Sequence, residues 1–81
     1  MHFFLHIREP GQNLDDPDGA EFRSLVEARQ EAIASIREIL GSEIKESGRC
    51  DVLARAIEIT APDGQVHDRV AFREAIVVDF C

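Results

Sequence analysis

The sequence predicts a small α+β domain in which one long amphipathic helix packs against one face of an antiparallel sheet. Three observations predict this class. One stretch, from Ser24 to about Glu46, has helical apolar periodicity, and short alternating segments flank it on both sides. Turn-forming residues separate those segments by only a few positions, which makes neighbouring strands antiparallel. The 81 residues, of which 44% are apolar, suffice for one domain over positions 1–81.

The first part of the sheet is predicted from residues 2–8, where apolar and polar side chains alternate. The core face of this strand would carry Phe3, Leu5 and Ile7, and its outer face would carry His2, Phe4, His6 and Arg8. Pro10 and Gly11 predict a turn. A short returning strand at 13–16 would complete a hairpin, and a second turn over 16–19 would precede the helix.

The helix is predicted from apolar residues that recur at steps of three and four and share one stripe: Leu25, Ala28, Ala32, Ile36 and Ile39. Ser24 and Glu27 form the S-x-x-E pattern of a helix N-terminus. Gly41 could end the helix, since glycine often follows a C-cap. However, Ile44 continues the apolar spacing and Gly48 offers a later stop, so we expect the helix to continue to about residue 46.

The rest of the sheet is predicted from Arg55 to Thr60 and from Val66 to Phe72, joined by a Pro-Asp-Gly turn. Val66, Val70 and Phe72 would face the core, with Asp68 near the exposed start of its strand. The apolar tail from Ala75 to Phe80 would raise the sheet from four strands to five, giving the order ββαββ(β). The residues expected to be buried together are Phe3, Leu5, Ile7, Leu25, Ala32, Ile36, Ile57, Ile59 and Val70.

Composition excludes several functions. The net charge is −7, and general binding to nucleic-acid phosphates needs clustered Lys and Arg, so we expect no nucleic-acid binding. The chain has neither the flanks of a signal peptide nor the ~18 apolar residues of a membrane span, which favours a cytoplasmic protein without membrane contact. Cys50 and Cys81 match no metal pattern and leave two interpretations open, a disulfide or two reduced thiols.

Candidate chemistry is weak. The acidic turn around Gly19 fails the EF-hand pattern, because counting from that glycine puts Leu14 at position one and Leu25 at position twelve. His2 and His6 share a strand face but would lie about 13 Å apart, too far to hold one metal ion. Arg29 falls within the apolar stripe, and we expect its guanidinium to reach the rim and meet Asp16 or Asp18.

No serine has a histidine at a suggestive spacing, and no glycine-rich phosphate loop occurs in the sequence. We therefore expect no catalytic residues, no metal and no cofactor.

Several motifs together resemble a family of short bacterial proteins whose domain is of unknown function. The resemblance rests on Phe3–Arg8 for an F-F-H-[IV]-R start, Asp15–Glu21 for a D-x-x-G-x-E turn and Ala28–Ala32 for an A-R-x-E-A helix. Ala56–Val66 and Phe72–Ala75 are similar to its later hairpin and closing segment. The acidic turn before the helix is also similar, more loosely, to that of HicB-like antitoxins, which implies a basic protein partner.

These observations favour a non-enzymatic protein-binding domain that associates with itself, most simply as a homodimer. The surface expected to do so combines outer-face residues of the first strand with the apolar tail: Phe4, His6, Ile76, Val77, Val78 and Phe80. Two alternatives stay open. One is an antitoxin-type neutraliser of a basic protein, and the other is a domain that binds or transforms a small ligand at a site without a recognisable motif.

Overall fold

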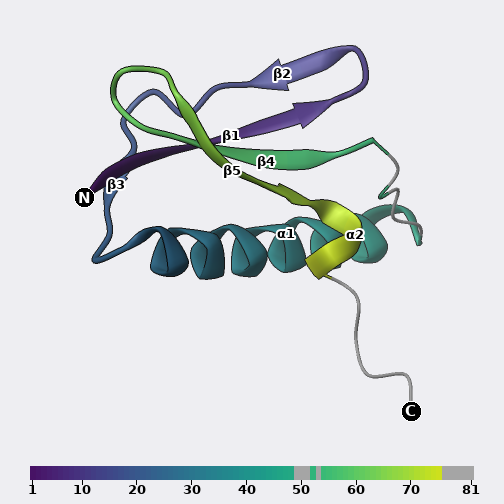
Figure 1. Ribbon diagram of the computed structural model, residues 1–81. Helices are drawn as coiled ribbons and strands as arrows, with labels where there is room; N and C mark the ends of the chain where they lie inside the picture. The colour runs from purple at the N-terminus through teal and green to yellow at the C-terminus, as the bar shows by residue number, and fades with distance from the viewer. Residues whose placement is uncertain (49–51, 53, 76–81) are drawn as a thin grey trace.

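A sheet of short strands lies along one long helix in the computed structural model, which describes residues 1–48, 52 and 54–75 (Figure 1). In chain order the elements are β1 His2–Glu9, β2 Gln12–Leu14, β3 Ala20–Glu21, α1 Leu25–Ser47, β4 Ala56–Thr60, β5 Val66–Ala71 and α2 Phe72–Ala75. The predicted α+β class is confirmed. The short elements β3 and α2 are additions that the periodicity did not indicate.

The sheet is antiparallel throughout, with the strand order β2-β1-β4-β5. Strand β1 is its centre, because β4 pairs along one edge while β2 and β3 pair with opposite ends of the other edge. The returning strand is Gln12–Leu14, so the predicted bounds of 13–16 were wrong. Residues 15–19 form a loop that connects β2 to β3.

Helix α1 begins and ends with the predicted caps. The Ser24 hydroxyl accepts a hydrogen bond from the backbone N–H of Glu27 at 3.2 Å. The Glu27 carboxylate in turn accepts from the backbone N–H of Arg23, one residue before the partner of a standard capping box. Gly41 lies inside the helix, as predicted. Gly48 ends the helix in the left-handed conformation, with φ at 75°, and its N–H donates to the carbonyl of Ile44.

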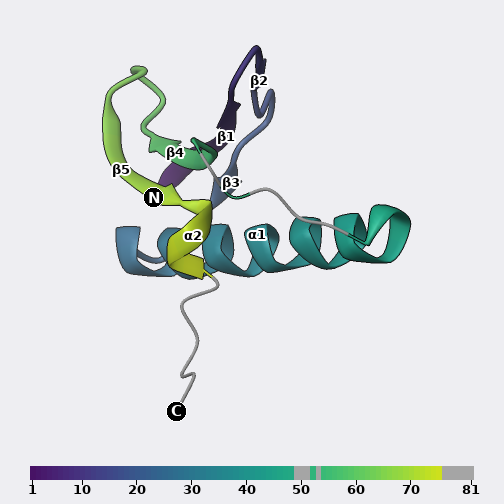
Figure 2. The same cartoon turned by 90° about the vertical axis from the view of Figure 1, so that its right-hand side faces the viewer.

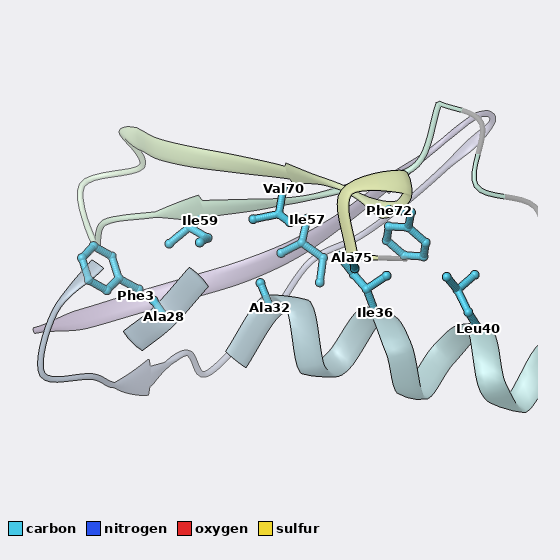
Figure 3. Close-up of a cluster of buried hydrophobic side chains, with 10 residues drawn as sticks. All are labelled: Phe3, Ala28, Ala32, Ile36, Leu40, Ile57, Ile59, Val70, Phe72 and Ala75. Atoms are coloured by element: carbon cyan, nitrogen blue, oxygen red, sulfur yellow. The ribbon is translucent and has the colours of Figure 1, made fainter. Parts of the chain in front are cut away.

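The core lies between α1 and the sheet, and α2 closes one end of it (Figure 3). Of the residues predicted to be buried together, Phe3, Ala32, Ile36, Ile57, Ile59 and Val70 are buried. Leu5, Ile7 and Leu25 are only partly buried and pack around the edge of this cluster. Phe72, which is fully buried, belongs to α2 and not to β5 as predicted.

A bulge in β5 overturns the predicted faces of Val66 and His67, whereas Val70, Arg69 and Ala71 lie on the faces predicted for them. Ile59 pairs with Asp68, but Thr60 pairs with Val66, so His67 is an extra residue between the two pairs. One inserted residue reverses the faces of all residues beyond it. Val66 is therefore 50% exposed and does not join Val70 in the core. The His67 ring contacts Phe3 edge-on, with 5.7 Å between the ring centroids.

Two further predictions concern residues outside the described ranges. These are the fifth strand, apart from Ala75, and the pairing of Cys50 with Cys81. Ala75 itself belongs to α2, where it is buried and its carbonyl accepts a hydrogen bond from the Arg37 Nε at 2.9 Å.

Candidate interaction surface

The sheet has one covered and one open side. Helix α1 lies against one side, and no helix or strand of the described ranges lies over the other (Figure 2). The predicted surface residues Phe4 and His6 belong to the open side, since Phe3 and Leu5, which alternate with them along β1, face the core. The open side therefore contains the described part of the surface that was predicted to mediate self-association.

An apolar row crosses the open side. Phe4 pairs with Thr60, and Thr60 pairs with Val66, so the three side chains stand on the same face of neighbouring strands. Thr60 is buried, Phe4 is half-buried, and Val66 is 50% exposed. The next row is polar and consists of His6, Glu58 and Arg69. Val66 was predicted to face the core, because the bulge that turns it outward depends on the pairing of β4 with β5.

Neighbouring rings shield much of Phe4. The His2 ring meets it edge-on at 5.1 Å between centroids, and the His6 ring stacks on it at 6.0 Å with only 7° between the planes. These contacts remove part of the apolar surface that Phe4 would otherwise expose. Phe4 therefore offers less exposed apolar surface than predicted, and Val66, which was not among the predicted surface residues, adds to it.

His6 is held by hydrogen bonds at both ring nitrogens. Its Nδ1 accepts from the backbone N–H of Asp16 at 3.0 Å, which places the proton on Nε2 in the neutral ring. The protonated Nε2 then donates to the Thr60 hydroxyl at 3.0 Å. Any role of His6 at an interface would therefore come from its ring surface. Within the residues placed by the structure, no three His, Cys, Asp or Glu residues form a metal-binding group.

Asp16 joins the loop between β2 and β3 to the central strand. One carboxylate oxygen accepts from the backbone N–H of Leu5 at 3.2 Å, and the other accepts from the N–H groups of Asp18 and Gly19. Burial of this carboxyl acts to raise its pKa, but the three N–H donors outweigh burial, so the pKa of Asp16 lies below its ordinary value of 3.8. The carboxylate thus replaces a strand partner where β1 has none.

Gly19 lets the same loop approach β1 closely. Its φ is +67°, which L-residues with a side chain rarely adopt. A Cβ at this position would also lie 2.6 Å from the His2 Nε2 and 2.8 Å from the Phe3 carbonyl oxygen. The Asp-x-x-Gly pattern at positions 16–19 therefore has a structural role, and neither residue is free to bind a ligand.

Salt bridges close the rim between the helix and the sheet. The Arg29 guanidinium donates to Asp68 at 3.0 Å and to Glu74 at 2.8 Å, and these acceptors hold the pKa of Arg29 above its ordinary value. The prediction that Arg29 reaches the rim is confirmed, but Asp16 and Asp18 as its partners were wrong. Asp68 is accordingly only 28% exposed and does not lie free at the start of β5.

Acid is expected to destabilise the protein by protonating the carboxylates of Asp16 and Glu74. Two hydrogen bonds hold the pKa of Glu74 below its ordinary value of 4.5. The one from the Ala71 N–H has the larger effect, and the one from Arg29 has the smaller effect. Since Asp16 and Glu74 both have lower pKa values in the folded state, their stabilising contribution is complete above the unfolded pKa values. It is lost as pH falls through the folded values. Thermal unfolding measured from about pH 7 to about pH 3 should show this loss.

The matched variant for this measurement is Asp16→Asn, which keeps one oxygen acceptor and cannot titrate. Its midpoint should be lower than that of the parent chain at about pH 7 and should change less below about pH 4. An identical pH dependence in both proteins would contradict the role given to Asp16.

The edges of the sheet are poor templates for another strand. Strand β2 has only three residues, and β5 carries the bulge at His67. Asp68 turns its charge toward the helix side of β5, where it meets Arg29. Short strands, bulges and inward-pointing charges are the devices by which sheet edges avoid pairing. The open face is therefore a better contact surface than either edge. The predicted tail residues Ile76, Val77, Val78 and Phe80 lie outside the described ranges.

Comparison with known proteins places this arrangement in a family. Residues 2–73 match the family described as Domain of unknown function (DUF6894). Searches of curated proteins and of solved structures give no match. Within the described ranges, no helix is both long enough and apolar enough to cross a membrane. The match spans every strand and α1, and the chain belongs to the DUF6894 family of domains of unknown function.

Proposed function

We propose that this chain is a non-enzymatic protein-binding domain whose partner is a second copy of itself. The observation that carries the proposal is the apolar row of Phe4, Thr60 and Val66 on the open side of the sheet. A twofold dimer would use this row twice, since both chains contribute the same patch. The polar row of His6, Glu58 and Arg69 beside it would lie nearer the rim of such an interface, where polar groups are usual.

The energy available to this row indicates a weak dimer. Complete burial of a valine contributes about 1.5–3 kcal/mol, and Val66 is already half-buried. Two copies of Val66 would therefore contribute on the order of 1.5–3 kcal/mol, with a smaller amount from each Phe4. A dissociation constant of ~100 μM corresponds to about 5.5 kcal/mol. Part of the difference would have to come from the apolar tail residues Ile76, Val77, Val78 and Phe80.

Sedimentation equilibrium tests the proposal with a matched pair of variants. Val66→Lys places a charge in the apolar row, whereas Val26→Lys places the same charge on an exposed position of α1, where valine is 65% exposed. At ~100 μM protein and about 0.15 M salt, we expect the parent chain and the Val26 variant to dimerise. The Val66 variant should be monomeric.

A truncated chain separates the row from the tail. It should end at Ala75, because Ala75 is buried and its carbonyl binds Arg37. A truncated monomer would assign much of the interface energy to the tail, and a truncated dimer would assign it to the row. A monomeric parent chain at ~100 μM, or equal association of the two lysine variants, would reject the proposed interface.

A second candidate is binding of a basic protein, as in an antitoxin. It is supported by acidic residues on the solvent side of α1, where Glu31, Glu38 and Glu46 are exposed. Such binding would weaken steeply with salt, because exposed charges are screened within about 10 Å at 0.1 M. Replacing the three glutamates with glutamine would abolish this binding and leave self-association through Val66 intact.

A further inference from the structure

A cavity of about 200 Å³ lies where β5 passes into α2. Three arginines stand among the residues that line it: Val52, Ala54, Arg55, Arg69, Ala71 and Arg73. The whole chain has only 9 basic residues against 16 acidic ones. The lining of this cavity therefore contains three basic side chains in a molecule whose net charge is −7.

The three arginines differ in what holds them. Arg55 donates to Glu9 at 3.1 Å and to Glu43 at 2.9 Å, and its guanidinium lies 4.4 Å above the centre of the Phe72 ring. It is therefore a fixed part of the cavity wall. The side chains of Arg69 and Arg73 are exposed and make no ion pair or hydrogen bond with other residues placed in the structure. Their charge is available to a ligand.

The sequence makes room for a ligand by using small side chains between these arginines. Arg69 and Ala71 are two positions apart on β5 and so share its open face. Ala71 pairs with Ala56 on β4, so two methyl groups occupy this part of the face. The volume equals that of about seven liquid waters and lies below the ~300 Å³ of common organic-ligand pockets. It suits a small ion better than a large cofactor.

We propose that this cavity binds a small oxyanion of the phosphate type, held by the guanidinium groups of Arg69 and Arg73. Each guanidinium can donate two parallel hydrogen bonds to two oxygens of the anion, a geometry that chloride cannot use. Arg55 forms part of the cavity wall and stays with its carboxylate partners Glu9 and Glu43, so the free positive charge of the site comes from Arg69 and Arg73. Arg69 belongs to the polar row beside Val66, whereas Arg73 lies in α2, so only one of the two anion-binding arginines stands next to the proposed dimer interface.

A free phosphate group and the phosphates of a nucleic acid offer the same oxyanion chemistry. The net charge of −7 opposes a polyanion, which would meet repulsion beyond the cavity. The free small anion is therefore the expected ligand, and a short RNA serves as the competing probe.

Backbone amide NMR of the full-length chain, titrated with inorganic phosphate, tests the site. We expect saturable shifts at the amides of Arg69, Ala71 and Arg73 at millimolar phosphate. Sodium chloride at matched ionic strength should not reproduce them. Arg69→Gln and Arg73→Gln should each weaken phosphate binding about tenfold, which corresponds to about 1.4 kcal/mol.

Arg23→Gln is the matched control. The Arg23 side chain is 93% exposed and does not line the cavity, so this substitution removes the same charge at a distant place. The proposal is overturned if chloride gives the same shifts, if the shifts stay linear to about 50 mM phosphate, or if the Arg23 variant weakens binding as much as the cavity variants. A single-stranded RNA that binds more tightly than inorganic phosphate would overturn the assignment to a small anion.

Discussion

Replacing Gly19 with alanine is expected to lower the free energy of unfolding by about 2–5 kcal/mol. Two effects add. The left-handed backbone at φ +67° disfavours any Cβ by roughly 1–2 kcal/mol. The new methyl group would also lie 2.8 Å from the carbonyl oxygen of Phe3, so the loop or the central strand must move. Urea unfolding followed by circular dichroism measures the loss.

Gly11→Ala is the control that separates these two effects. Gly11 has a similar φ of +76°, but a Cβ there would have no neighbour within 4 Å. Its replacement should therefore cost only the backbone term, roughly 1–2 kcal/mol. Equal losses for the two variants would show that the contact between the loop and β1 adds nothing to the stability.

Phe72→Ala is expected to cost about 3–5 kcal/mol, because the side chain is fully buried and leaves a large void. A chain of 81 residues has a total stability of about 4–12 kcal/mol, so this variant should be partly unfolded at room temperature or unfold at much lower urea concentration. The ring also supports the guanidinium of Arg55 at 4.4 Å, an attraction that alanine removes.

Phe72→Leu distinguishes packing from this attraction. Leucine keeps most of the apolar volume but offers no ring face to Arg55, so the loss should be intermediate. Unfolding midpoints of the three proteins give the comparison. A Phe72→Ala chain as stable as the parent would contradict the central place of this residue in the core.

Local signals were enough to predict most of the fold. The helix and its capping residues Ser24 and Gly48 follow from spacing and from the chemistry of single residues. The hairpin of β4 and β5 follows from alternation around a Pro-Asp-Gly turn. The bulge at His67 was not predicted, because alternation alone cannot reveal an inserted residue until the partner strand is known.

The candidate sites depended even more on contacts between distant residues. Arg29 was correctly placed at the rim, but its partners Asp68 and Glu74 are 39 and 45 positions away. The acidic turn was a visible pattern, yet only the fold explains it, because Asp16 binds the unpaired N–H of Leu5. The cavity between Arg69 and Arg73 had no sequence signal, since it arises where β5 turns into α2.

The central position of β1 also bears on how the chain folds. His6 of β1 and Thr60 of β4, whose side chains are hydrogen-bonded to each other, are 54 positions apart, whereas the hairpin β4–β5 joins near neighbours. Pairing between distant segments is slow, because the chain must first lose the entropy of closing a long loop. Helix α1 shortens that search, since its 23 residues span about 35 Å as a helix and about 75 Å when extended. The helix is therefore both the cover of the core and the spacer that brings the two halves of the sheet within reach of each other.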